Sequence, residues 1–234
     1  MSLSLKSRRV GDIGVVACTG RIVEGEESAA LQREFVDTLS IDPRVVLDLG
    51  GVDYIDSSGL GLLVRFLNRS RAASGGLKLC AVPARVVEVL RITNLAPIFE
   101  SFASEAEAVA AFYQSASEAE TPFRFHTSIL CIDRSANVLA GMREVLGQAG
   151  YGAMSADNLP DALILMQATR PALVVIGAAI HRAAGAPGMD RFKKLLEGIA
   201  VIELPEDFAS QDAGEANRKL VEQVRAALTR PKAS

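Results

Sequence analysis

An acid, two hydroxyls and a glycine stand in a row at the most informative point of the chain: Asp56, Ser57, Ser58 and Gly59. They follow the apolar segment Arg44–Leu49 and precede a leucine-rich run. This order is typical of a buried strand, a tight turn and a helix start, where Asp56 or Ser57 can cap the helix by accepting backbone N–H bonds. Helix N-termini favour anions. Open α/β sheets bind ligands and partners at the edge formed by the carboxyl ends of their strands, which is where this segment is expected to lie. The segment is therefore a candidate site, with plain helix capping as the alternative.

The surrounding sequence offers little for catalysis. Residues 1–120 contain no histidine, so Ser57 has no local partner for a Ser-His-Asp triad. The tripeptide Gly59–Gly61 lacks the Gly-Lys-Ser/Thr tail of a phosphate-binding loop. We therefore expect a protein that is not an enzyme and that uses no cofactor and no metal. The cysteines lie in apolar runs without metal-ligand spacing and are predicted to be reduced core residues: Cys18, Cys80 and Cys131.

Composition sets the class of protein. The chain has 234 residues, of which 49% are hydrophobic and 23% charged, enough for a packed core in one or two domains. A net charge of −3 gives no basic field that would attract nucleic acid. No apolar run reaches the ~18 residues of a membrane span, and the first ten residues lack the apolar centre of a signal peptide. Together with reduced cysteines, these features favour a cytoplasmic protein without a membrane partner.

Strand-like and helix-like segments alternate through residues 1–115, which indicates an α/β sandwich with a largely parallel sheet. The predicted strands are Asp12–Thr19, Arg44–Leu49, Leu77–Val82 and Ile98–Phe102, and the predicted helices are Glu24–Leu39, Leu60–Arg71, Ala84–Ile92 and Glu105–Tyr113. Residues 116–126 are small and polar and include Pro122, so they are predicted to be a linker between two domains.

The same alternation continues through residues 127–234 and predicts a flavodoxin-like, doubly wound parallel sheet. Its predicted strands are Ser128–Ile132, Tyr151–Ala156, Ala172–Ile176 and Ile199–Leu204. Its predicted helices are Ala136–Ala149, Leu159–Thr169, Asp190–Leu196 and Ala216–Leu228.

Several motifs of the first domain together resemble the STAS family, the domain of anti-sigma factor antagonists and of sulphate-transporter tails. They are Thr19–Ile22, interpreted as the turn before the first helix, the strand Leu47–Leu49, the segment Val52–Gly61, and Leu90–Leu95 before the last strand. The resemblance covers residues 3–115. Its most specific part is the Asp-Ser-Ser-Gly-Leu-Gly run directly after a buried strand.

This resemblance implies a partner-switching regulator. Ser57 stands where members of the family are phosphorylated by an anti-sigma factor with an ATP-binding serine-kinase fold. The unphosphorylated antagonist binds that kinase and frees the sigma factor, phosphorylation releases the antagonist, and a phosphatase resets it. Whether the protein forms a homodimer is left open by the sequence. The residues implied in partner binding are Asp53, Asp56, Ser57, Ser58 and Gly59.

Charge explains how such a switch would work. A phosphate adds about −1.5 to −2 charges, and on Ser57 it would lie beside Asp56 and near Asp53, which is interpreted as a turn residue. A loss of 1.4 kcal/mol already costs tenfold in affinity. Asp56 either only caps the helix or also orients the Ser57 hydroxyl. A structural role is expected for Ser58, and close backbone or helix–sheet approach is expected at Gly59 and Gly61.

Two other functions stay open. In the first, the protein is a scaffold or adaptor that does not switch, and Ser57 is an inert cap. In the second, it is a small-molecule sensor, because the apolar interior of a STAS-type domain can hold a ligand.

The segments Ile129–Asp133, Gly147–Tyr151, Arg170–Ile176 and Pro187–Asp190 together resemble motifs of the response-regulator receiver family, over residues 127–229. In that family an acidic pair binds Mg²⁺ and an aspartate at the end of the third strand is phosphorylated. Here the pair reads Asp133-Arg134, and Gly177 stands at the phosphoacceptor position. Mg²⁺ binding needs carboxylate oxygens, and one acid of the pair is replaced by Arg134. Aspartyl phosphorylation needs an aspartate, and Gly177 does not supply one. We therefore expect a degenerate receiver-like domain for protein interaction or dimerisation, with Asp133 capping the next helix and one strand–helix unit missing or remodelled after Pro205. The alternative is an unrelated flavodoxin-like domain without a signalling role.

Overall fold

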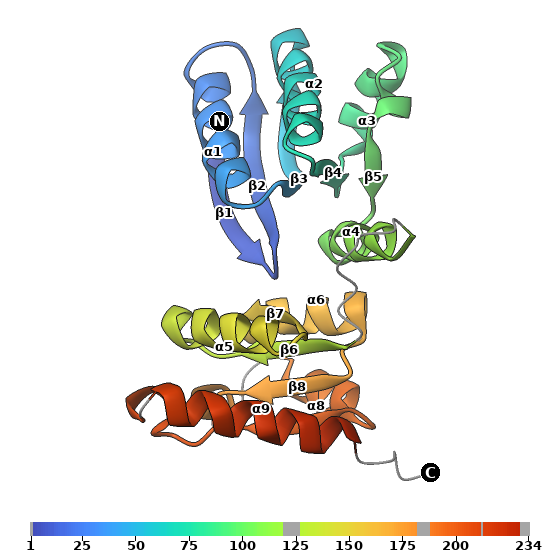
Figure 1. Ribbon diagram of the computed structural model, residues 1–234. Coiled ribbons are helices and arrows are strands. Elements are labelled where there is room, and N and C mark those ends of the chain that lie inside the picture. The colour runs from blue at the N-terminus through green and yellow to red at the C-terminus, as the bar shows by residue number, and fades with distance from the viewer. Residues whose placement is uncertain (1, 119–126, 182–187, 212, 230–234) are drawn as a thin grey trace. The chain divides into compact units, whose positions relative to one another are not determined.

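The computed structural model describes residues 2–118, 127–181, 188–211 and 213–229 (Figure 1). The chain divides into two compact units, unit 1 from Met1 to Phe112 and unit 2 from Tyr113 to Ser234. Helix α4, Glu105–Glu118, reaches into the predicted linker 116–126, because the alanine- and glutamate-rich sequence continues as helix through Glu118. The rest of that linker, residues 119–126, lies outside the described residues.

Unit 1 is built on one mixed sheet with the strand order β1-β2-β3-β4-β5. The first strand pairs antiparallel with the second, and all other neighbours are parallel. The strands are β1 Ser4–Val10, β2 Ile13–Ile22, β3 Arg44–Ile55, β4 Gly76–Cys80 and β5 Glu100–Phe102. The α/β architecture expected for the first domain is thus confirmed, with one antiparallel edge strand.

Helices cover both faces of this sheet. One face packs against α1 Glu26–Ile41, α2 Ser57–Ala72 and α3 Ala84–Ile92, and a 3-10 turn, η1, follows at Ala96–Ile98. Side chains alternate along a strand, so Leu77 and Leu79 of β4 join the core under these helices, whereas Lys78 points to the other face. There its ammonium group lies 4.8 Å from the ring centre of Phe112 in α4.

Two strands are longer than their sequence predicted, and this corrects the interpretation of the site. Strand β2 continues through Ile22, so the predicted turn Thr19–Ile22 is strand, and β3 continues through Ile55, so Asp53 is a strand residue and not a turn residue. The ladder between the two strands persists through register shifts. Gly51 allows this close pairing, because a Cβ there would lie 2.5 Å from Thr19 Oγ1.

Unit 2 contains a four-stranded, fully parallel sheet with the order β7-β6-β8-β9. This order corresponds to the first four strands of the flavodoxin-like order 2-1-3-4-5, and the described residues of unit 2 form no fifth strand. The strands are β6 Ser128–Ile132, β7 Gly152–Ala156, β8 Leu173–Ile176 and β9 Ala200–Glu203. The helices are α5 Ala136–Gln148, α6 Leu159–Thr169, α7 Ala178–His181, α8 Met189–Leu196 and α9 Ala213–Thr229, and η2 is Phe208–Ser210.

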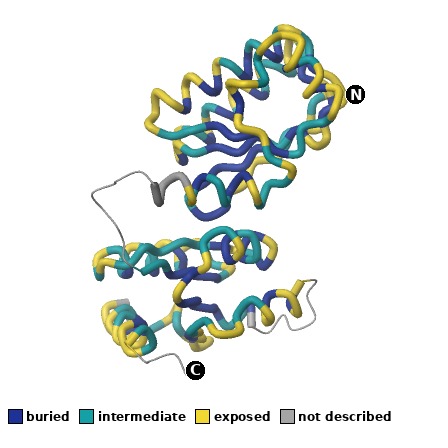
Figure 2. Tube along the Cα trace, turned by 90° about the vertical axis from the view of Figure 1, so that its right-hand side faces the viewer, coloured by how far each residue is buried: buried dark blue, intermediate teal, exposed yellow. Residues whose placement is uncertain are grey.

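Alternation again divides the side chains of unit 2 between two faces. Ile129 and Cys131 of β6 share a core with Leu146 of α5 and Leu220 of α9. The alternate strand residues face the side of α6 and α8. In both units the central strands are buried and the outer faces of the helices are exposed (Figure 2).

The three cysteines are free and buried, as expected. None of the helices in the described part of the chain is both long enough and apolar enough to cross a bilayer.

Candidate functional site

Ser57 is the first residue of α2 and lies directly beyond the carboxyl end of β3. Its side chain is exposed. Within the described residues no hydrogen bond to the Ser57 hydroxyl is formed. A buried residue would have contradicted a site that a second protein must reach, and Ser57 is exposed.

Asp56 is the residue that holds this junction together. Its backbone is extended (φ −97°, ψ −177°), as at a helix N-cap, and its Oδ1 accepts a hydrogen bond from the Gly59 N–H at 2.8 Å. Its Oδ2 accepts another from the Glu24 N–H at 3.0 Å, and its own N–H donates to the Ile22 carbonyl at 3.2 Å. Both carboxylate oxygens therefore bind backbone, which favours the capping role over orientation of the Ser57 hydroxyl.

These contacts also keep the carboxyl group ionised. Partial burial by itself would raise the pKa of Asp56. Hydrogen bonds from the backbone N–H groups of Gly59, Glu24 and Ser58 outweigh that effect, and the positive charge of Arg21 adds to them. The pKa of Asp56 therefore lies below its usual value. Ser57 thus has a permanent negative charge beside it at neutral pH.

The two glycines of the motif differ in what they do. A Cβ on Gly59 would lie 2.7 Å from the Ile22 carbonyl oxygen and 2.7 Å from Ile55 Cγ1, so the close helix–sheet approach expected there is confirmed. A Cβ on Gly61 would meet nothing nearer than the tip of Arg65, at 3.7 Å. The same expectation is wrong for Gly61, because this residue lies on the outer side of α2 and away from the sheet.

Two arginines to which the sequence analysis gave no role contact residues of the predicted site or their neighbours. The guanidinium of Arg85, in α3, donates to the Asp53 backbone carbonyl at 2.7 Å and lies 3.9 Å from its carboxylate. The guanidinium of Arg21, at the end of β2, lies over the ring of Tyr54, 5.0 Å from its centre. A weak signal was available, since Arg21 and Tyr54 lie within the motif segments Thr19–Ile22 and Val52–Gly61, but their pairing depends on strand register.

The predicted site residues therefore share one place, the end of β3 and the first turn of α2. Asp53 and Ser57 are exposed, Asp56 and Ser58 are partly buried, and Gly59 is buried against the sheet. The glycine contributes by its close packing rather than by direct access. In the described residues no group of three or more His, Cys, Asp or Glu side chains is placed to hold a metal ion.

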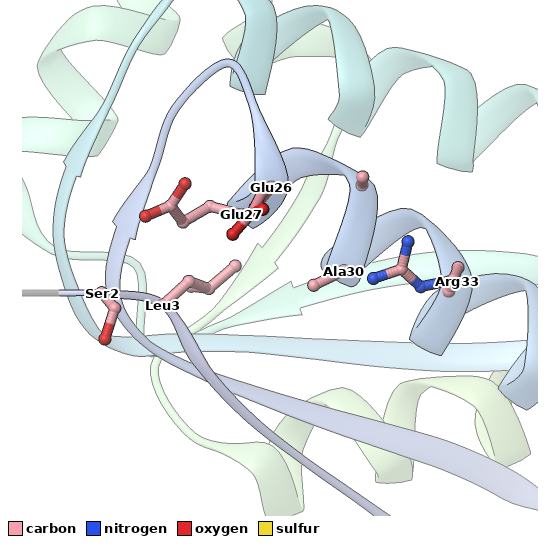
Figure 3. A pocket seen from close by; sticks show the side chains of 7 residues that line it. Ser2, Leu3, Glu26, Glu27, Ala30 and Arg33 are labelled. Atoms are coloured by element: carbon pink, nitrogen blue, oxygen red, sulfur yellow. The ribbon is translucent and has the colours of Figure 1, made fainter.

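A hollow of about 490 Å³ lies near the start of α1 and is lined by Ser2, Leu3, Glu26, Glu27, Ala29, Ala30 and Arg33. Figure 3 shows the side chains of Leu3, Glu26, Glu27, Ala30 and Arg33 around this hollow. A more apolar hollow of about 320 Å³ lies in unit 2 beside Phe192 and Val201, with Lys193 and Glu203 among its lining. Neither hollow includes a residue of the Ser57 segment.

Gly177 stands where a receiver would have its phosphoacceptor aspartate, and the space beside it is occupied by a neighbouring side chain. A Cβ on Gly177 would lie 2.8 Å from Asp133 Cγ, so the Asp133 side chain takes the space beside this residue. The expectation that Asp133 caps the next helix is wrong. Asp133 Oδ1 accepts from the Ser135 N–H at 2.7 Å, and Ser135 is the N-cap of α5.

Comparison with known proteins identifies the family of the first unit. The STAS domain family matches residues 4–108. A curated relative is 34% identical over 99 residues, which are 42% of this chain and 85% of the relative. The chain therefore belongs to the STAS family through its first unit. The match ends at residue 108, so the receiver-like interpretation of residues 127–234 stays a prediction.

The curated relative is BtrV of Bordetella bronchiseptica, a proposed anti-sigma factor antagonist. Among solved structures, a proposed anti-sigma factor antagonist from Thermotoga maritima is 22% identical, with a TM-score of 0.44 over 47% of this chain and 94% of that one. A STAS-domain anti-sigma factor antagonist from Planctomyces limnophilus is 25% identical, with a TM-score of 0.42 over 47% of this chain and 97% of that one.

Proposed function

We propose that this protein is an anti-sigma factor antagonist that switches partners through Ser57. The observation that carries the proposal is the exposed Ser57 hydroxyl at the start of α2, beside a carboxylate that stays charged. The similarity to BtrV supports the general function. The partner would be an anti-sigma factor with an ATP-binding serine-kinase fold, bound while Ser57 is unphosphorylated.

Rigidity of the junction supports this role. Asp56 ties the start of α2 to the loop before α1 through Glu24, and Gly59 lets the helix sit directly on the ends of β2 and β3. The backbone at Ser57 is therefore held in place, which lowers the entropy lost when a partner binds.

Phosphorylation would act through like charges. A phosphate on Ser57 adds about −1.5 to −2 charges next to Asp56 and near the exposed Asp53. At an interface shaped for a neutral hydroxyl, desolvating these neighbouring negative charges is costly. The phosphorylated form would then be released, and a phosphatase would restore the binding form.

The test measures affinity for each purified serine-kinase anti-sigma factor encoded in the same genome. We expect Ser57→Ala to bind like the wild type and Ser57→Asp to bind at least about tenfold more weakly. With ATP, mass spectrometry should find phosphate on Ser57 in the wild type and none in Ser57→Ala. Ser58→Ala serves as the control and should still be phosphorylated. Equal binding by Ser57→Ala and Ser57→Asp would contradict the proposal.

That result also decides between the proposal and its alternatives. In a scaffold that does not switch, Ser57→Asp would bind like the wild type, since the residue is then only an exposed neighbour of the cap. In a small-molecule sensor, native mass spectrometry would show a retained ligand. In the proposed function the protein is not an enzyme, and it acts in the cytoplasm.

We assign unit 2 a role in protein interaction or dimerisation as a degenerate receiver-like domain. The parallel strand order and the side chain of Asp133 beside Gly177 support this assignment. Light scattering of the full chain at several concentrations tests the homodimer, which would show twice the mass of the 234-residue chain.

A further inference from the structure

An exposed arginine–tyrosine pair lies beside the Ser57 segment. Arg21 and Tyr54 are direct neighbours in the register of β2 and β3, near the carboxyl ends of both strands. The Arg21 guanidinium lies 5.0 Å from the centre of the Tyr54 ring, and the tyrosine is 48% exposed. The ring is therefore held in place by a charge rather than by the core.

The fold has little need of this pair. An exposed cation–π contact contributes little to the stability of a fold, and Tyr54 is absent from the buried core of unit 1. Tyrosine and arginine are nonetheless the residue types that most often dominate binding energy at protein interfaces. Because each side chain already restrains the other, a partner that binds them loses less side-chain entropy.

Charges at this edge indicate what the partner must offer. Arg21 is close enough to Asp56 to lower the pKa of that carboxyl, and Arg85 is fixed by its bond to the Asp53 carbonyl. Two restrained guanidinium groups thus lie in this region, one near Asp56 and one bound to Asp53. Carboxylates are the natural partners of such groups, since they accept paired N–H bonds from the guanidinium fork.

We propose that the Arg21–Tyr54 pair is a second anchor for the partner that binds at Ser57. The partner presents a carboxylate to Arg21 and an apolar hollow to the exposed ring of Tyr54. This inference rests on the proposed function, because the occupant is the same anti-sigma factor. It adds a contact on β2 and β3 that carries affinity independently of the state of Ser57.

The experiment uses the full chain and the purified serine-kinase anti-sigma factor that binds the wild type. Tyr54→Ala and Arg21→Gln should each weaken binding by about tenfold or more. Tyr54→Phe should bind like the wild type, because the ring rather than the hydroxyl fills the hollow. The urea midpoint of each variant should fall only slightly below that of the wild type, which excludes unfolding as the cause.

Two control variants change side chains of similar type elsewhere. Ile41→Ala removes an apolar side chain that is 69% exposed at the far end of α1. Arg91→Gln removes an exposed arginine that is paired with Glu88 on α3. Both should bind like the wild type.

The outcomes separate the two proposals. If Tyr54→Ala and Arg21→Gln bind like the wild type while Ser57→Asp loses binding, the second anchor is wrong and the switch at Ser57 stands. If Ser57→Ala and Ser57→Asp bind equally, the proposed switch is wrong. Weaker binding by Tyr54→Ala and Arg21→Gln would then still support the second anchor. If the wild type binds none of the kinases, both proposals are overturned.

Discussion

The carboxylate of Asp56 accepts a hydrogen bond from the backbone N–H of Glu24, 3.0 Å away and 32 residues earlier in the chain. With its other oxygen it caps α2 through Gly59. One side chain therefore joins two loops at the carboxyl edge of the sheet, and the position of Ser57 depends on it.

Removing the Asp56 carboxylate should destabilise the protein. An N-cap contributes about 1 kcal/mol, and the bond to Glu24 leaves a second backbone donor without its acceptor. We expect Asp56→Ala to lower the free energy of unfolding by about 1–3 kcal/mol, measured by urea denaturation. Asp53→Ala is the matched control, since its carboxylate is exposed and 3.9 Å from Arg85. An equal loss in both variants would contradict the capping role.

The pH dependence of Asp56 has a defined sign. Its pKa is lower in the folded chain than the unfolded value of about 3.9. The ionised form therefore stabilises the fold fully above that unfolded value, and this contribution is lost as the pH falls through the lower, folded pKa. The difference in unfolding free energy between wild type and Asp56→Asn should be constant from pH 5 to 7 and shrink below about pH 4. A difference that grows on acidification would refute this assignment.

The two motif glycines should respond oppositely to alanine. Gly59→Ala forces a methyl group against the Ile22 carbonyl and Ile55, and overpacking of this kind costs about 1–3 kcal/mol. Gly61→Ala has room and removes a glycine from a helix, which should stabilise by about 0.5–1 kcal/mol. Thermal unfolding of both variants measures this difference. Destabilisation by Gly61→Ala would show that the outer face of α2 is packed.

The three thiols should be unreactive while the chain is folded. Burial, with the negative charge of Asp48 in addition, raises the pKa of Cys18 to about 12, and burial raises the pKa of Cys131 to about 12. The pKa of Cys80 is raised for the same reasons as that of Cys18. Since the thiolate is the reactive form, a thiol reagent at pH 8 should label none of them in native protein and all three in urea. Rapid labelling of native protein would contradict the buried placement.

Gly177 and Asp133 should be coupled in stability. A side chain at Gly177 must displace Asp133, which also holds the Ser135 N–H. We expect Gly177→Ala to destabilise unit 2 by about 1–3 kcal/mol and the added change Asp133→Ala to recover part of that loss. A double-mutant cycle by urea denaturation measures the coupling. Additive effects would show that the two residues do not compete for the same space.

Regular, strongly apolar elements were the most predictable part of the fold. The helix Ala84–Ile92 and the strand Ser128–Ile132 have the bounds that their sequences indicate. Strand β1 was not predicted, because its mostly polar, exposed residues carry no apolar alternation. Pairing with β2 forms this edge strand, and a pairing partner is not visible in a local pattern.

Sequence alone determined the site segment, its family resemblance and the α/β class, because helix capping and apolar periodicity are local properties of Asp56–Gly59 and the segments around it. Tertiary structure decided that Asp53 lies in a strand and that Asp56 also binds Glu24. It likewise decided that Gly61 faces outward and that Arg21 lies on Tyr54. Each of these features depends on how strands and helices that are distant in the sequence pack and pair in register. The spacing of residues along one segment does not determine that pairing.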